Sequence, residues 1–84
     1  MRLHSFEWDD INVAHIARHN VTPEEVEEAF ESRHRIRRSR AGRYALLGRS
    51  ATGRYLMVAF IIRAGTVRAI TARDMTSTEK RLYP

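Results

Sequence analysis

The sequence predicts an α+β fold in which two helices pack on one face of a four-stranded antiparallel meander. Helix-start signals and apolar residues at helical spacing occur together in residues 9–31. After Arg33, β-prone segments follow one another with turns of two or three residues between them, a pattern typical of consecutive hairpins. A length of 84 residues allows one hydrophobic core, so we expect a single domain over residues 1–84.

A short strand and a first helix are expected at the start of the chain. Residues 6–8 are β-prone, with Trp8 anchoring this strand to the core, and acids follow directly. Asp9 or Asp10 suits the N-cap of a helix that runs to about His19. At 100° per residue, the apolar side of this helix collects Val13, Ala14, Ala17 and Val21, and the other side collects Asn12, His15 and His19.

A second helix follows at once. Asn20 suits the left-handed residue that closes the first helix. Thr22 then offers a cap, Pro23 the first helical position, and Glu25 a side chain that can reach back to the cap. The glutamates lie near the positive end of the helix dipole, which explains them without a catalytic role. The apolar stripe consists of Val26, Ala29 and Phe30.

Four strands and a last short helix are expected in the second half. Residues 35–40 are polar and suit an edge strand. Residues 44–50, 54–63 and 66–73 complete the meander, and the middle one is apolar on both faces from Tyr55 to Ile62. That run indicates a central strand covered on each side, with Tyr55 and Phe60 in the core. A cap at residues 76–79 predicts a helix over residues 77–83.

The charge is split between the two halves. Residues 1–32 hold eight acids and two bases, whereas residues 33–84 hold thirteen bases and two acids. Fourteen of the fifteen bases are arginine, whose planar guanidinium holds two phosphate oxygens at once. This favours a nucleic acid or an acidic protein as partner, although these charges could also simply solvate a sheet.

Several classes of protein are excluded by composition. The chain has no cysteine, so disulfides and thiolate metal sites are ruled out. Its N-terminus lacks the apolar run of a signal peptide, and its longest apolar stretch is too short to span a bilayer. We therefore expect a soluble, intracellular, cytoplasmic protein.

Five motifs occur in series along the chain: FEWD at residues 6–9, HIARHNVTPEE at 15–25, GRS at 48–50, ITARDMT at 70–76 and EKRLY at 79–83. In this order and spacing they resemble the BrnT family of bacterial type II toxins, over nearly the whole chain. Two departures stand out. Asn20 replaces the usual glycine, and residues 33–40 form an arginine-rich strand where many relatives carry a longer acidic or mixed segment.

The resemblance implies a RelE-like fold and a ribonuclease that inhibits translation. It also implies neutralisation by a BrnA-like ribbon-helix-helix antitoxin, in a complex of two toxins and two antitoxins that represses its own operon. DNA would be contacted only through the antitoxin, and no membrane would be involved.

RNA cleavage without a metal needs a base, an acid and cations that stabilise the charge on phosphorus. The attacking 2′-hydroxyl makes the substrate RNA rather than DNA. We expect Arg49 and Arg73, at strand ends beside small residues, to hold the phosphate, and His19 to act as base or acid. The expected RNA-binding residues are Lys80, Tyr83, Arg43 and Arg54.

Other interpretations stay open for the same residues. Arg49 and Arg73 could be ion-paired to the acidic helices, His19 could bond a carbonyl at its helix end, and Tyr83 could pack. The chain could be a non-catalytic basic module that binds an acidic partner or nucleic acid, or a subunit that needs a partner for stability. His15 and His19 share a helix face but lack a third ligand, so we expect no metal and no cofactor.

Overall fold

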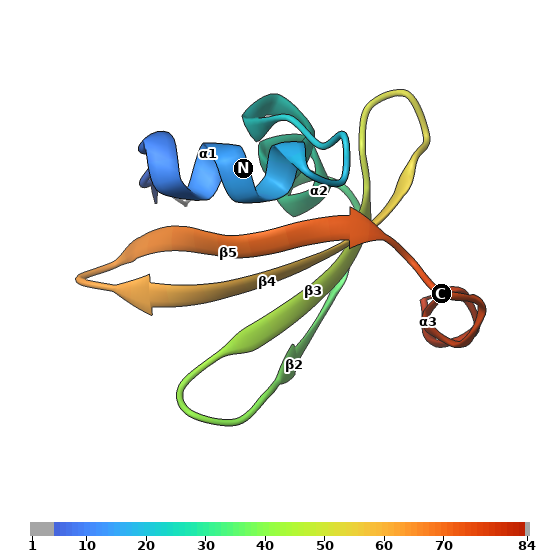
Figure 1. Cartoon of the computed structure of the whole chain (residues 1–84). Coiled ribbons are helices and arrows are strands. Elements are labelled where there is room, and N and C mark those ends of the chain that lie inside the picture. The colour runs from blue at the N-terminus through green and yellow to red at the C-terminus, as the bar shows by residue number, and fades with distance from the viewer. Residues whose placement is uncertain (1–4, 84) are drawn as a thin grey trace.

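The structure, a computed structural model, describes residues 5–83 of the chain. Its elements in chain order are β1 (Ser5–Phe6), α1 (Asp10–Ala17), α2 (Pro23–Glu31), β2 (Arg35–Arg38), β3 (Tyr44–Arg49), β4 (Tyr55–Arg63), β5 (Thr66–Asp74) and α3 (Ser77–Leu82). One five-stranded sheet runs in the order β1-β5-β4-β3-β2, and Figure 1 shows β5, β4, β3 and β2 following one another in that order. Strands β2 to β5 pair as antiparallel hairpins, which confirms the predicted α+β class and its meander. The short β1 pairs in parallel with β5 at the far edge.

Some predicted elements extend one or two residues too far, and two predicted turns are too short, since five residues join β2 to β3 and five join β3 to β4. The edge strand stops at Arg38 because the Ser39 amide donates to the Arg43 carbonyl at 2.8 Å, which closes the turn. The first helix stops at Ala17, and the following amides bond three residues back, as at the tightened end of a helix. Asn20 then takes the expected left-handed conformation, with φ of 58°.

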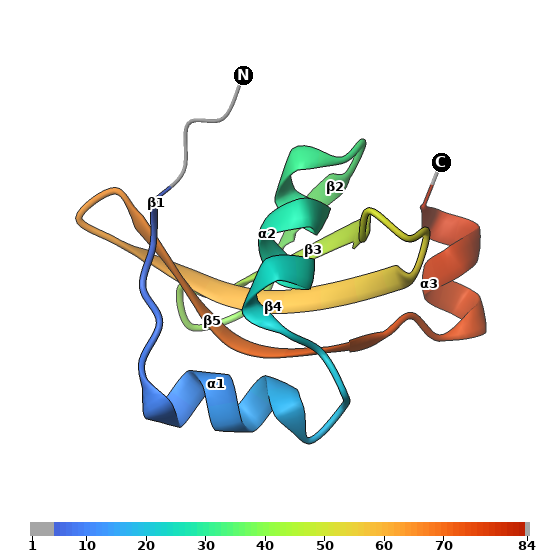
Figure 2. The same ribbon diagram turned by 90° about the horizontal axis from the view of Figure 1, so that it is seen from above.

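Helices α1 and α2 lie on one face of the sheet, whereas α3 lies apart from them, beyond the end of β5 (Figures 1 and 2). The main core fills the space between the first two helices and the sheet. Its largest fully buried side chains are Phe60, Ile16, Leu46, Leu56, Val26, Val58 and Val67. The predicted packing of two helices on one sheet face is therefore confirmed, as is the core position of Phe60.

The orientation of α1 differs from the predicted one. Asn12 and Ile16 are buried against the sheet, while Ala14 and Ala17 are exposed. The Asn12 side-chain amide donates to the carbonyls of Glu7 at 2.9 Å and Ala69 at 3.3 Å. An eight-residue helix has few apolar contacts to fix its rotation, and a buried amide must keep its partners. These hydrogen bonds therefore override the apolar side that the sequence indicates.

Helix α2 follows the sequence closely. Thr22 and Glu25 form the expected reciprocal cap, and the predicted apolar stripe is buried. The helix approaches β3 so closely that a Cβ on Gly48 would lie 2.7 Å from the Ala29 carbonyl oxygen. Gly48 therefore serves helix–sheet packing, and not the approach of a phosphate to Arg49 that its small size suggested.

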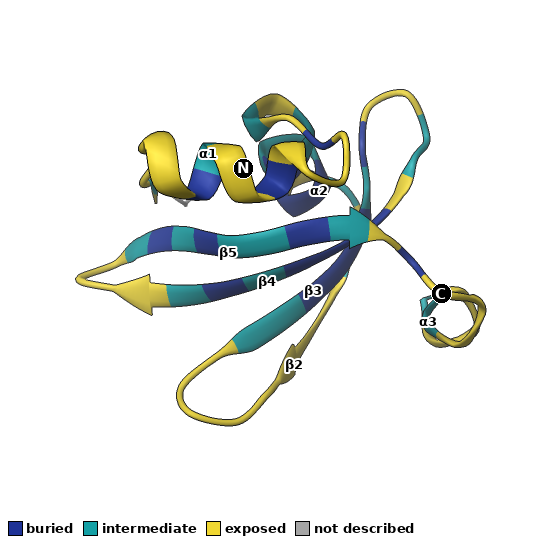
Figure 3. Cartoon of the chain, in the orientation of Figure 1, coloured by how far each residue is buried: buried dark blue, intermediate teal, exposed yellow. Residues whose placement is uncertain are grey.

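A second, smaller core lies on the opposite face of the sheet. Leu47, Met57 and Met75 are buried there, and Tyr83 packs beside them. Tyr55 belongs to this face and not to the core, because its side of the sheet is only partly covered and it remains 36% exposed. Strand β2 and the turn after it are exposed throughout (Figure 3). No helix of the described residues is long and apolar enough to cross a membrane.

Candidate functional site

A pocket of about 310 Å³ opens on the face of the sheet that α1 and α2 leave uncovered. Its floor is apolar and comes from β3 and β4, with Leu47 and Met57 at its base. Its rim is charged and consists of Arg37, Arg43, Arg73 and Glu79. An apolar floor with a few converging charged groups is the usual composition of a ligand site.

Arg73 and Glu79 form a bidentate ion pair at this rim. The distances are 2.8 Å from Nη1 to Oε1 and 3.0 Å from Nη2 to Oε2. The hydrogen bond from Arg73 is the largest cause that lowers the pKa of Glu79, and the same bond raises the pKa of Arg73. Glu79 also caps α3, since its Oε1 accepts from the Thr76 amide at 2.9 Å. The pair therefore connects β5 to the first turn of α3.

Three of the predicted site residues gather around one ring, that of Tyr55. The Arg49 guanidinium carbon lies 4.4 Å from the ring centroid and the Lys80 nitrogen 5.5 Å from it. Tyr83 meets the same ring edge-on, with centroids 5.9 Å apart. Arg49 is further held by two hydrogen bonds to the Gly53 carbonyl, at 3.2 and 3.0 Å. Within residues 5–83, neither cation has a carboxylate partner.

The sheet register brings the Arg73–Glu79 pair and the residues around Tyr55 onto one face of the sheet. Arg49 lies opposite Tyr55 across β3 and β4, and Arg73 lies opposite Met57 across β4 and β5. Opposed residues of antiparallel strands point to the same side, as do residues two apart on one strand. The α-carbons of Arg49 and Arg73 are thus separated by about 10 Å across the sheet and about 7 Å along it.

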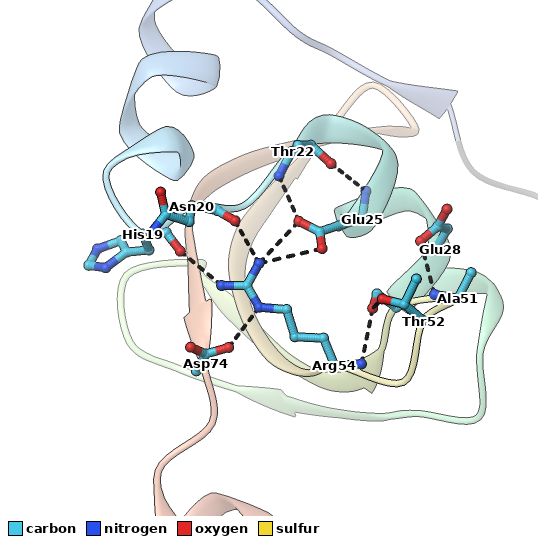
Figure 4. Close-up of polar contacts among 10 residues, drawn as sticks. His19, Asn20, Thr22, Glu25, Glu28, Ala51, Thr52, Arg54 and Asp74 are labelled. Carbon is cyan, nitrogen blue, oxygen red and sulfur yellow. Dashed lines mark hydrogen bonds and ion pairs between the residues drawn. The ribbon is translucent and has the colours of Figure 1, made fainter.

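Arg54 lies outside this face, in a network that joins both helices to the sheet (Figure 4). Its guanidinium donates to the Asp74 carboxylate at 2.8 Å, to the Glu25 carboxylate at 3.2 Å, and to the carbonyls of Asn20 and His19 at 2.6 and 2.9 Å. The bond from Arg54 is the largest cause that lowers the Asp74 pKa. These contacts are structural, and they leave the guanidinium little room for RNA.

His19 is exposed at the end of α1, and its ring points away from the Arg54 network (Figure 4). It does not line the pocket, whose described lining comes from β2 to β5 and α3. His15 lies near the sheet instead, with Nδ1 3.1 Å from the Ile70 carbonyl oxygen. Residues 5–83 contain no group of three or more His, Asp or Glu side chains placed to hold a metal.

Sequence reasoning missed Glu79, Arg37 and Tyr55. Glu79 already had a complete explanation as a cap, and Tyr55 lay in an apolar run. Only Arg37 could have been found from the sequence. It lies on the edge strand of the meander, where every second residue points to the same face of the sheet. Arg43, which was expected to bind RNA, does line the pocket.

The split charge is partly neutralised inside the fold. Arg68 pairs with Asp9 at 2.9 Å and with Glu7 at 3.6 Å, and Arg63 pairs with Glu7 at 3.6 Å. Arg54 pairs with Glu25, as given above. In contrast, no ion pair in the described part of the chain involves any arginine of residues 33–43, the arginine segment, which comprises Arg33, Arg35, Arg37, Arg38, Arg40 and Arg43.

Comparison with known proteins identifies the family. A family model described as "Ribonuclease toxin, BrnT, of type II toxin-antitoxin system" matches residues 8–79, which is 72 of the 84 residues. The match runs from Trp8 to Glu79 and therefore includes the whole helical layer and the Arg73–Glu79 pair. It confirms the resemblance drawn from the five motifs. No curated protein matches the sequence.

Proposed function

We propose, from the premise that this chain belongs to the BrnT family of ribonuclease toxins of type II toxin–antitoxin systems, that it cleaves RNA without a metal at the pocket beside Arg73. The family assigns ribonuclease activity and implies RNA as substrate and an antitoxin as partner. The single observation that carries the proposal is the Arg73–Glu79 pair. It places a guanidinium that can bind two phosphate oxygens next to a carboxylate, at the rim of one pocket.

The Arg73 fork suits a scissile phosphate. A guanidinium binds the two oxygens of a phosphate in the same geometry in which it binds a carboxylate. In the RNA-free protein Glu79 fills this fork, so the phosphate must replace it. Arg37 and Arg43 on the same rim add positive charge where negative charge develops on phosphorus.

Glu79 is the proton acceptor in this scheme, in place of His19. Once phosphate takes the fork, the carboxylate loses the partner that lowers its pKa and gains an anionic neighbour, and both changes make it a stronger base. It then takes the proton of the 2′-hydroxyl, the 2′-oxygen bonds to phosphorus, and the bond to the 5′-oxygen breaks. The 5′-oxygen takes a proton from water or from the Lys80 ammonium, leaving a 2′,3′-cyclic phosphate and a 5′-hydroxyl.

Arg49, Lys80 and Tyr83 hold the RNA on the same face. The two cations over Tyr55 have free donors for a neighbouring phosphate, because Arg49 uses only part of its fork on Gly53. Tyr83 keeps α3 in place by donating its hydroxyl to the Arg33 carbonyl at 2.7 Å.

The antitoxin in this proposal is a BrnA-like ribbon-helix-helix protein. Acidic side chains of such a partner would be attracted to the cationic rim and would cover the pocket directly. The complex of two toxins and two antitoxins would contact DNA through the antitoxin alone. Toxin and RNA would meet in the cytoplasm, where translation is inhibited.

Cleavage of a labelled single-stranded RNA by the purified toxin, with and without EDTA, tests the reaction. We expect equal rates in both conditions and 2′,3′-cyclic phosphate ends on the products. Arg73→Gln should lower the rate by about 10²–10³, while Arg63→Gln, a matched charge change outside the pocket, should leave it within about threefold. Loss of activity in EDTA, or 3′-hydroxyl ends, would contradict the mechanism.

A further inference from the structure

The arginine segment is the most concentrated unpaired charge in the described chain. Its six arginines lie within eleven residues that contain no acid. All four residues of β2 are exposed, and so is the turn after it (Figure 3). Like charges this close repel one another, and no carboxylate of residues 5–83 forms an ion pair with them. We infer that the arginines of this segment that share the pocket face form a binding track for single-stranded RNA that leads into the pocket.

The register of β2 decides which arginines belong to the track. Arg35 lies opposite Leu47, and Arg37 lies opposite Ala45. Both of those β3 residues belong to the core on the pocket face, so Arg35 and Arg37 point to that face as well. Arg38 lies opposite Tyr44, which packs against the core under the helices. Arg38 therefore points to the other face and lies outside the track.

The track is continuous with the pocket. Arg37, Ser39 and Arg43 line the pocket together with Arg73, and the segment begins at Arg33, whose carbonyl accepts the Tyr83 hydroxyl. Arg35 and Arg37 are about 6.6–6.8 Å apart along the strand, a spacing that successive phosphates of an extended strand can match. RNA held at Arg73 can thus extend over Arg37 and Arg35 without leaving the face.

RNA fits this arrangement better than an added peptide strand does. A peptide strand would pair with the backbone of the β2 edge and would meet the side chains of both sheet faces equally. Short, charged edge strands also discourage strand pairing. The charges that adjoin the pocket are confined to one face, which is the arrangement expected for a ligand that crosses that face. The identification of the ligand as RNA rests on the proposed function.

Salt dependence of RNA binding tests the track. The probe is a fluorescent oligouridylate of about 12 nucleotides with 2′-O-methyl groups throughout, which blocks cleavage by removing the 2′-hydroxyl. Binding is measured by anisotropy between about 50 and 200 mM salt, because log K falls as log salt rises and each lost phosphate contact makes this negative slope shallower by about 0.7. Since the probe cannot be cleaved, the result is independent of whether the proposed reaction occurs.

Four variants test which arginines contact the RNA and whether their charge is what matters. Arg35→Gln should make the slope shallower by about 0.7 and Arg35→Gln/Arg37→Gln by about 1.4, while Arg38→Gln, the same change on the same strand, should leave it unchanged. Arg35→Lys/Arg37→Lys should keep the wild-type slope because the positive charge is retained. Equal losses in Arg35→Gln and Arg38→Gln would overturn the track in favour of attraction by net charge alone. A wild-type slope in the double glutamine variant would overturn it in favour of an acidic protein partner.

Discussion

The Glu79 carboxylate engages both arms of the Arg73 guanidinium, with Nη1–Oε1 and Nη2–Oε2 distances of 2.8 and 3.0 Å. This pair spans only six residues, yet it joins the end of β5 to α3 across the rim of the pocket. Helix α3 has no buried residue of its own. The pair therefore holds α3 at the pocket and at the same time fills the fork that a phosphate would use.

The pair makes part of the protein's stability depend on pH. The Glu79 pKa is lowered below its ordinary value of 4.5, chiefly by the bond from Arg73. A lowered folded-state pKa stabilises the fold fully above the unfolded value, and this contribution is lost as the pH falls through the folded value. The melting temperature of wild type should therefore exceed that of Glu79→Gln most at neutral pH, and the difference should shrink below about pH 4.5. A difference independent of pH would rule this linkage out.

Arg54 should be a stabilising residue. Arg54→Gln removes bonds to Asp74, Glu25 and two carbonyls at the junction of α1, α2 and the sheet. Because the side chain is 25% exposed, we expect a loss of about 1–3 kcal/mol in the free energy of unfolding, measured by urea titration. Arg63→Gln, which loses one longer pair on a side chain that is 63% exposed, should change it by less than about 0.5 kcal/mol. Equal effects of the two substitutions would contradict the role of the network.

Gly48 should tolerate no side chain. Gly48→Ala places a methyl group 2.7 Å from the Ala29 carbonyl oxygen, so α2 must move, at a cost of about 1–3 kcal/mol. Gly65→Ala meets no atom within 4 Å but takes φ of +78°, which costs about 1–2 kcal/mol through backbone strain alone. The two can be told apart by the α2 amides: Gly48→Ala should speed their hydrogen exchange and Gly65→Ala should not. If the α2 amides of Gly48→Ala exchange as in wild type, the close approach of position 48 to the Ala29 carbonyl does not control the stability of α2.

Tyr55 should act by positioning Arg49. Tyr55→Leu removes the ring beneath the guanidinium, a contact worth about 0.5–1 kcal/mol at a partly exposed site. We expect the affinity for the uncleavable RNA to fall about two- to fivefold, which follows from that energy. Tyr55→Phe keeps the ring face and should bind like wild type. If the phenylalanine variant binds as weakly as the leucine variant, the hydroxyl and not the ring is what matters.

The fold was largely predictable because its signals are local. The caps at Asp9, Thr22 and Thr76 depend on residues three positions away, and the connections of the meander are also short, with five residues in the first two and two in the last. The rotation of α1 was not predictable, because it is fixed by a hydrogen bond from Asn12 to Ala69, 57 positions along the chain.

The candidate site was partly predictable for the same reason. Arg49 was chosen as a strand-end residue beside small neighbours, and Lys80 and Tyr83 as residues that the last helix could bring to the sheet. The fold gathers all three at Tyr55. Glu79 was missed because its local role as a cap accounts for its place in the sequence, while its contact with Arg73 depends on how α3 turns back after β5. Glu79 has two roles, and its sequence context reveals only the role that depends on its near neighbours.

The most direct test of the account compares chemistry with binding in Glu79→Gln, which keeps a side-chain oxygen for the cap of α3. If Glu79 is the base and also competes for Arg73, single-turnover cleavage should slow by about 10²–10⁴, while the uncleavable RNA should bind as tightly as to wild type or more tightly. A cleavage rate close to wild type, or a loss of binding that parallels the loss of cleavage, would contradict the central role given to this carboxylate.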